Sequence, residues 1–278
     1  MRKAGRALVV IAFTLVSCSQ RVVPSATPAL ETRALRIYAT GATLPLLEDL
    51  TDAFSTLNRD IVFEMESGSF REILARLLTG ETPFILSTYL PPDDAQTNPL
   101  WAAPVAQDGI ALIRHPSNPV TGLTSAQIRA IYSGAIQNWS ALGGPDAPIT
   151  VFTREEGSDT RAEFEAQIMG SQATTPLARI APSDTAMRAS IAGDPSAIGF
   201  LSSALLDSSV QTLAVDGVMP SQAALGDDAY PLRSFVYLIG LREPDGSEPL
   251  DLDYRAFFAW IQGPDGQAVV AERYGPLE

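Results

Sequence analysis

Residues 149–164 read ITVFTREEGSDTRAEF, which divides into an apolar strand, a polar loop and the first turns of a helix. A strand that runs through such a loop into a helix is the repeating unit of α/β folds. The loop also has a chemical meaning. Because the N-terminus of a helix carries unpaired N–H groups and a partial positive charge, a loop of glycine and hydroxyl residues placed there is a candidate anion site.

Two earlier loops have the same design. The first loop, residues 41–45, reads GATLP, and the second loop, residues 67–69, reads SGS; the third loop is GSDT at 157–160. Each follows an expected strand and precedes an expected helix. Arg154 stands just before the third loop, and a guanidinium fork matches the oxygens of an oxyanion. The alternative is that these hydroxyl residues are ordinary helix N-caps that bind nothing.

The rest of the chain alternates in the same way. Apolar runs at 35–39, 61–65, 109–113, 197–201 and 234–239 predict strands. Apolar residues at helical spacing predict helices from Pro45, over 70–78, over 124–132 with a capping box, and near 257–261 and 268–274. The sequence therefore predicts an α/β fold with mainly parallel sheets.

The N-terminus indicates export. Basic residues are followed by a short apolar run at 8–16 and by Leu-Val-Ser before Cys18, which resembles a bacterial lipobox. We expect residues 1–18 to be a lipoprotein signal peptide, Cys18 to carry the lipid that holds the protein to a membrane, and residues 19–33 to be a flexible tether. The alternative is a chance buried thiol in an uncleaved anchor. Cys18 is the single cysteine, so no intramolecular disulfide is expected.

Charge and composition disfavour several classes of function. The formal net charge of −13 argues against nucleic-acid binding, although a local set of donors can still hold a small anion. His115 is the single histidine, and with Pro116 after it at the end of an expected strand it is typical of a surface turn and not of the base of a hydrolase triad. One histidine and one cysteine cannot form a His/Cys metal cluster. We therefore expect no enzyme activity, no metal and no cofactor.

Three runs of sequence carry a family resemblance. They are DGIALI at 108–113 with the segment to 124, IYSGAIQNWSALGGPDAPI at 131–149 with TREEGSDTR at 153–161, and AIGF at 197–200 followed by LAVDGVMPS at 213–221 and YPL at 230–232. From about residue 35 to the end, the chain resembles the phosphate-binding proteins of ABC transporters.

The resemblance implies a two-lobed periplasmic-binding-protein (Venus-flytrap) fold, with mixed, mostly parallel sheets joined by a two-segment hinge. Lobe 1 would be residues 34–108 plus 231–278, and lobe 2 residues 109–230. It further implies a monomer that delivers inorganic phosphate or a related oxyanion to an ABC transporter permease. The family's anion contacts fall on Thr43 and Leu44 in the first loop, on Ser67 and Ser69 in the second, and on Arg154, Ser158 and Thr160 at the third.

The sequence departs from the family pattern in three places. Asp159 replaces a glycine of the third loop, Glu66 replaces a small residue, and the segment 83–89 lacks the family's aspartate, with Tyr89 where an arginine stands. One hypothesis is that Asp159 takes over from the missing aspartate and accepts the proton of a phosphate. The alternatives are that Asp159 faces solvent, or that it repels the anion and the site has changed its ligand. A sensor or scaffold of the same fold, or a receptor for another small anion, therefore stays open.

Overall fold

The structure is a computed structural model that describes residues 32–92, 99–249 and 251–277. The predicted signal peptide, Cys18 and residues 19–31 of the predicted tether lie outside the described residues. The first strand, β1 (Arg33–Thr40), begins one residue before the predicted start of lobe 1. The Arg33 guanidinium pairs with Asp60 and Asp253, which fixes the start of this strand.

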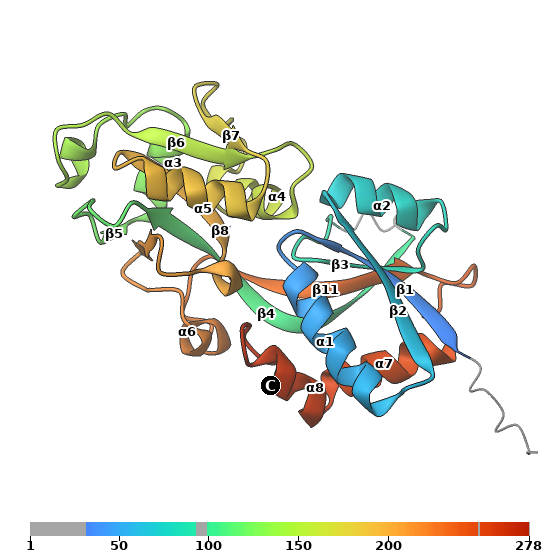
Figure 1. Cartoon of the computed structure of the whole chain (residues 1–278). Helices are drawn as coiled ribbons and strands as arrows, with labels where there is room; N and C mark the ends of the chain where they lie inside the picture. Colours follow the sequence, from blue (N-terminus) through green and yellow to red (C-terminus); the bar gives the residue numbers. More distant parts are fainter. Residues whose placement is uncertain (1–31, 93–98, 250, 278) are drawn as a thin grey trace, which may run out of the picture. The chain divides into compact units, whose positions relative to one another are not determined.

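One mixed sheet runs through the described chain (Figure 1). Its strand order is β2 (Ile61–Gly68), β1, β3 (Phe84–Ser87), β11 (Arg233–Leu241), β4 (Leu100–Arg114), β8 (Ala197–Ser202), β6 (Thr150–Arg154) and β7 (Arg179–Ala181). Strands β2, β1 and β3 are parallel, as are β8, β6 and β7, whereas the ladders through β4 and β11 are antiparallel. Short pairs join β9 (Gln211–Thr212) to β4 and β10 (Ala214–Val215) to β5 (Gly122–Leu123).

Strand β4 belongs to both ends of this sheet. Its residues from Leu100 to Gly109 pair with β11, and those from Ile110 to Arg114 pair with β8. We call the part that contains β1, β2, β3 and β11 the β1 half, and the part that contains β8, β6 and β7 the β6 half. The chain passes from one half to the other within a continuous strand, which Figure 1 shows in green between them.

The helices flank the two halves separately. The β1 half carries α1 (Leu44–Leu57), α2 (Phe70–Leu78), α7 (Leu252–Gln262) and α8 (Pro264–Val270). The β6 half carries α3 (Ser125–Tyr132), α4 (Asp159–Phe164), which continues as a π-helical turn over Glu165–Met169, and α5 (Asp184–Gly193), with α6 (Gln222–Gly226) near β4. The predicted helix over 70–78 is confirmed, and so is the capping box of Thr124 and Gln127.

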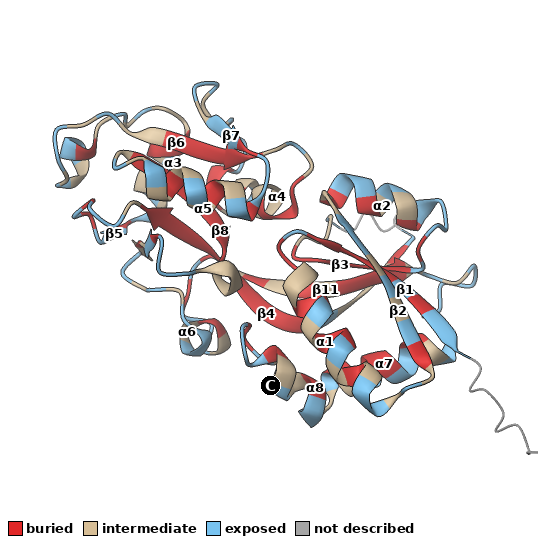
Figure 2. Cartoon of the chain, viewed as in Figure 1, coloured by how far each residue is buried: buried red, intermediate tan, exposed pale blue. Residues whose placement is uncertain are grey.

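Each half has its own hydrophobic core. In the β1 half, Phe54 packs against Phe257 with ring centroids 5.0 Å apart, in a cluster that includes Leu46, Leu50 and Ile261. In the β6 half, Phe164 stacks on Phe200 at 4.2 Å. Figure 2 shows that buried residues follow the strands and one side of the helices. Both cores are large enough to hold the loops at the strand ends in place.

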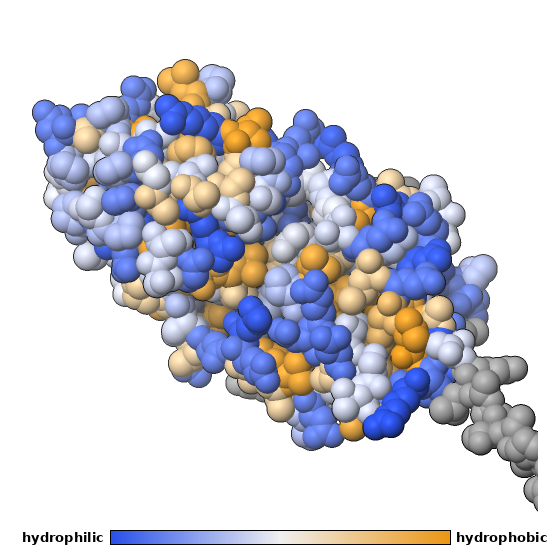
Figure 3. Space-filling model, in the orientation of Figure 1, coloured by the Kyte–Doolittle hydropathy of each residue, from blue (hydrophilic) through white to orange (hydrophobic). Residues whose placement is uncertain are grey.

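The surface is predominantly polar on the face seen in Figure 3, with smaller apolar areas between the hydrophilic ones. The large apolar side chains that are exposed include Leu78, Leu177 and Ile180. Within the described ranges, no helix has the length and apolar character needed to cross a bilayer.

Candidate functional site

One pocket of about 390 Å³ is lined by residues of the first and second predicted loops and by the segment that leads into the third loop. Gly41 comes from the first loop, Ser67 and Ser69 from the second, and Arg154 from the end of β6. The start of α5 closes the remaining side with Asp184. The β1 half and the β6 half therefore both contribute to this pocket. Its lining residues are Gly41, Ser67, Gly68, Ser69, Glu72, Arg154, Glu155, Glu156, Pro182, Ser183 and Asp184.

The first loop leaves the N-terminus of α1 open. Thr43 is fully buried, but its hydroxyl donates to Leu86 O at 2.8 Å and contacts Thr40 Oγ1 at 3.0 Å instead of capping the helix. Leu44 begins α1, and no acidic side chain lies in the first turn of this helix. The partial positive charge of a 14-residue helix thus remains available to an anion at this end.

The second loop is already capped. Ser69 accepts from the Glu72 N–H at 3.4 Å, and the Glu72 carboxylate accepts from the Ser69 N–H at 2.9 Å. The capping box therefore uses backbone N–H groups that we expected to be available to an anion. The spacing of Ser69 and Glu72 is the S-x-x-E signature, so the sequence did contain the signal. Ser67 is the residue before the last of β2 and is exposed to the pocket.

The third loop is capped as well. Ser158 is buried and its hydroxyl accepts from the Arg161 N–H at 3.3 Å, which makes it the N-cap of α4. Helix α4 has only six residues before the π-helical turn, so its dipole is weaker than that of α1. Of the three predicted helix ends, only that of α1 lacks a side-chain cap.

Asp159 does not face solvent. The residue is 3% exposed, and its Oδ2 accepts from the Thr88 hydroxyl at 3.1 Å, from the Thr88 N–H at 3.3 Å and from the Thr40 hydroxyl. Thr160 donates from its N–H to Asp159 Oδ1 at 2.8 Å. The structure therefore brings this carboxylate directly against the altered segment 83–89, within which Thr88 lies.

Arg154 is 5% exposed and held by two carboxylates. Its Nη1 donates to Asp184 Oδ1 at 2.6 Å, and its Nε donates to Glu155 Oε2 at 3.0 Å. Burial lowers the pKa of the Arg154 guanidinium, but the charges of Asp184 and Glu155 outweigh burial, so the pKa is raised. The guanidinium is preorganised at the pocket wall and stays charged.

Carboxylates outnumber cations around the pocket. Glu72, Glu155, Glu156 and Asp184 line it, with Arg154 as the one basic lining residue. Burial raises the pKa of the Asp184 carboxyl; Arg154 opposes this rise, and the nearby charge of Asp159 adds to it. An incoming anion therefore needs close hydrogen bonds to overcome the negative field of this pocket.

Three residues that bind side chains of predicted site residues were not themselves predicted from the sequence. Thr40 closes β1, Thr88 follows β3, and Asp184 is the first residue of α5. Thr40 directly precedes the first loop and Thr88 lies within the segment 83–89, and both have the same hydroxyl chemistry as the predicted threonines. Asp184 follows an ordinary N-cap serine, and nothing local in the sequence connects it with Arg154, 30 residues earlier.

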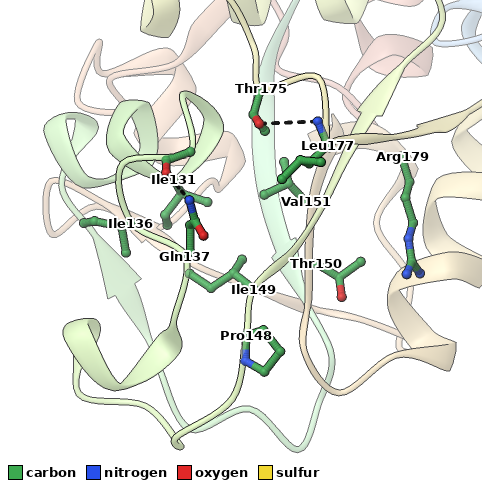
Figure 4. A pocket seen from close by; sticks show the side chains of 11 residues that line it. Ile131, Ile136, Gln137, Pro148, Ile149, Thr150, Val151, Thr175, Leu177 and Arg179 are labelled. Carbon is green, nitrogen blue, oxygen red and sulfur yellow. Dashed lines mark hydrogen bonds between the residues drawn. The ribbon is translucent and has the colours of Figure 1, made fainter.

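A second pocket, of about 260 Å³, lies within the β6 half and contains none of the predicted site residues (Figure 4). Apolar side chains such as Ile131, Ile149 and Val151 dominate it, and Arg179 is its charged residue. In the described part of the chain, no group of three or more His, Cys, Asp or Glu side chains is placed to hold a metal ion. The pocket with Arg154 is therefore the candidate site.

Comparison with known proteins identifies the family and agrees with the fold. A family model described as a PBP superfamily domain matches residues 24–262. The chain belongs to the PBP superfamily. The predicted α/β fold of the periplasmic-binding-protein type is confirmed, with antiparallel ladders at the centre of the mixed sheet.

Within this superfamily, the chain is similar to proteins named for phosphate. The phosphate-binding protein PstS of Bacillus subtilis is 28% identical over 227 residues, which are 80% of this chain and 74% of that protein. PstS of Pseudomonas aeruginosa strain PAO1 is 27% identical over 197 residues, 63% of this chain and 60% of its own length. These names describe binding proteins.

Among solved structures, a protein from Clostridium perfringens described as a phosphate ABC transporter substrate-binding protein was solved with phosphate bound. It is 29% identical, has a TM-score of 0.80, and the alignment covers 88% of this chain and 100% of that one. An ABC-type phosphate transport receptor from Vibrio cholerae has a TM-score of 0.73 at 22% identity over 88% and 100% of the two chains, which is a likeness of fold.

Proposed function

We propose that this member of the PBP superfamily is an extracytoplasmic receptor that binds phosphate, or a related oxyanion, between its two halves for uptake by an ABC transporter. The observation that carries the proposal is the pocket that both halves line beside Arg154 and the open end of α1. The phosphate-bound relative from Clostridium perfringens, 29% identical at a TM-score of 0.80, supports the choice of ligand.

We further propose how the site residues act. The Leu44 N–H at the start of α1 and the Ser67 hydroxyl contact the anion from the β1 half, while Arg154 supplies the positive charge from the β6 half. Thr43, Ser158 and Thr160 are buried outside the pocket lining, and their hydroxyls already have protein partners, so they do not contact the anion in this arrangement. Ser69 belongs to the capping box of α2 and assists only if Glu72 moves.

The same proposal includes the organisation of the whole protein. Lobe 1 is residues 34–108 plus 231–278, and lobe 2 is residues 109–230, with the change of partner of β4 after Gly109 as the support. Residues 1–18 direct export, Cys18 carries a lipid, and residues 19–33 tether the domain, with the correction that Arg33 is already part of β1. The protein acts as a monomer and hands its ligand to a membrane permease.

A second function is favoured by one specific observation. In the β6 half, Asp159 already accepts a hydrogen bond from Thr88 of the β1 half, and Asp184 already accepts one from Arg154. A chain whose anion contacts are filled by its own carboxylates suits a sensor or scaffold of the same fold, or a receptor for a different small anion. The two functions differ in whether the chain binds phosphate at micromolar concentration or below.

Calorimetry separates them. Purified chain carrying Cys18→Ser is titrated with phosphate and separately with sulfate near pH 7.5, and we expect heat of binding with phosphate. Ser67→Ala removes one hydroxyl from the pocket and should weaken phosphate binding about 10- to 150-fold, in line with about 1.5–3 kcal/mol for a hydrogen bond to a charged group. Ser208→Ala, an exposed serine outside the pocket, is the matched control. Absence of binding by the parent chain to either anion would remove the uptake proposal and leave the second function.

A further inference from the structure

The Asp159 carboxylate joins the two halves of the molecule through a small set of donors. This donor set consists of the Thr40 hydroxyl, the Thr88 hydroxyl and the Thr88 N–H, and all three meet Asp159 Oδ2. Thr40 ends β1 and Thr88 directly follows β3, which is the neighbour of β1 in the sheet. Asp159 begins α4 in the β6 half. The contact therefore runs from one half to the other.

The carboxylate is saturated by these bonds. Its Oδ1 accepts from the Thr160 N–H at 2.8 Å and from the Thr160 hydroxyl at 3.4 Å. A carboxylate offers about four acceptor positions. Five donors on the two oxygens, with 3% of the residue exposed, leave no position for a proton carried by a ligand. In this arrangement Asp159 is a ligand of the β1 half, and the hypothesis that it accepts the proton of a phosphate is disfavoured.

The chemistry of the donor set is that of an anion site. An N–H and two hydroxyls that converge on one oxygen are the contacts that stabilise a negatively charged oxygen in a site sheltered from water. A second carboxylate of the β6 half, that of Asp184, pairs with Arg154 of its own half and also lies close to the β1 half. A Cβ placed on Gly41, next to the open end of α1, would lie 3.5 Å from Asp184 Oδ2.

We infer that Asp159 is a tethered anion, which occupies the donor set in place of a free oxyanion and latches the two halves together. The latch follows from the contacts alone, whereas its competition with phosphate rests on the proposed function. Because Asp159 is covalently attached, its effective concentration at the donor set is high, and a free anion that uses these donors must displace it. Asp159 thereby lowers the affinity for phosphate and makes closure of the molecule less dependent on a ligand.

The latch is tested by a distance between the halves. Spin labels at Leu78→Cys in α2 and Leu177→Cys in the β6 half, both exposed at 53% and 80%, are introduced into the chain with Cys18→Ser. Without phosphate, we expect a single short distance in the parent and a longer, broader distribution with Asp159→Gly. Asp159→Asn, which keeps the shape and loses the charge, should lie between them. Asp52→Asn removes an exposed carboxylate of α1 and should change nothing. Unchanged distances in both Asp159 variants overturn the latch.

The competition is tested by phosphate titration of the same proteins. We expect Asp159→Gly to bind phosphate at least about 10-fold more tightly than the parent. Thr88→Val, which removes one donor of the set, should open the phosphate-free protein as Asp159→Gly does, without a gain in affinity. Weaker binding by Asp159→Gly overturns the competition and makes Asp159 a contact of the anion. If the distances lengthen as expected but no variant binds phosphate, the latch stands and the proposed function fails.

Discussion

At the scale of single residues, burial decides what a charged side chain does. Arg154, Asp159 and Asp184 are all nearly inaccessible, and each has partners from a distant segment. Desolvation makes an unpaired charge costly, so the chain supplies a partner for each one. The same logic applies to Asp108, which lies on β4 just before this strand changes its partner from β11 to β8.

Asp108 is 1% exposed and accepts from the Ser203 hydroxyl at 2.8 Å, from the Gly109 N–H at 2.7 Å and from the Ser202 hydroxyl. Burial raises the pKa of this carboxyl, and the hydrogen bonds only partly oppose the rise. A raised pKa means that the folded protein binds the proton more tightly than the unfolded chain. Ionisation of Asp108 therefore reduces stability as pH rises from the unfolded value of about 3.9 through the folded value.

We predict that Asp108→Asn removes this dependence on pH. In urea unfolding at several values from pH 4 to pH 8, the free energy of unfolding of the Asn variant should improve relative to the parent as pH rises. Asp108→Ala leaves the donors of Ser203 and Gly109 without an acceptor and should cost about 1–3 kcal/mol or more at every pH. A difference between parent and Asn variant that is constant with pH would contradict the prediction.

At the scale of the elements, helix ends and close helix contacts follow local rules. The capping boxes of α2 and α3 form as their sequence signatures require. The link between α7 and α8 depends on a different local feature, which is the absence of a side chain at Gly266. A Cβ at this position would lie 2.4 Å from Trp260 O and 2.5 Å from Ile261 Cα.

We predict that Gly266→Ala destabilises the protein by about 1–3 kcal/mol, because both contacts are to backbone that cannot move aside easily. The matched change is Gly193→Ala at the end of α5, where a Cβ would meet nothing within 4 Å. It should stabilise the protein by about 0.5–1 kcal/mol, since alanine loses less backbone entropy in a helix. Chemical unfolding measures the change in the free energy of unfolding for each variant. Equal changes in the two variants would contradict the prediction that a side chain at Gly266 clashes with the backbone.

At the scale of the whole molecule, the two cores share one long strand, β4. Clusters around Phe54 and Phe164 stabilise the two halves, and β4 and β11 connect them. Ser202 and Ser203, which both bond to Asp108, extend the connection into the β6 half. A pocket between halves joined in this way can open by bending at a few residues while both cores stay intact.

The predicted membrane anchor also belongs to this scale. We expect the chain produced in a bacterium to take up labelled palmitate and to fractionate with membranes, whereas Cys18→Ala should do neither. A single acyl chain holds a protein to a membrane only weakly, and stable anchoring takes a second chain or a basic patch. Because this chain has a net charge of −13, we expect its attachment to depend on the lipids at Cys18. Ser19→Ala is the control and should keep both the label and the membrane association. Membrane association of Cys18→Ala without label would refute the lipid anchor.

Part of this protein could be predicted from the sequence alone. The periods of the apolar residues predicted the main strands and helices. The loops at 41–45 and 67–69 and Arg154, but not the loop at 157–160, supplied predicted residues that line the candidate pocket. Short elements such as β5, β7 and β9 were not predicted, because two or three residues carry no period. Helix α5 was not predicted either, although Ser183 is its N-cap.

Only the tertiary structure decided which donors remain for a ligand. Asp159 meets Thr40 across 119 positions and Thr88 across 71, and Asp184 meets Arg154 across 30. Local sequence determines hydrogen bonds within a turn or a helix end, because their partners are a few residues apart. The partner of a buried charge depends on how the two halves approach each other, and no local pattern contains that information.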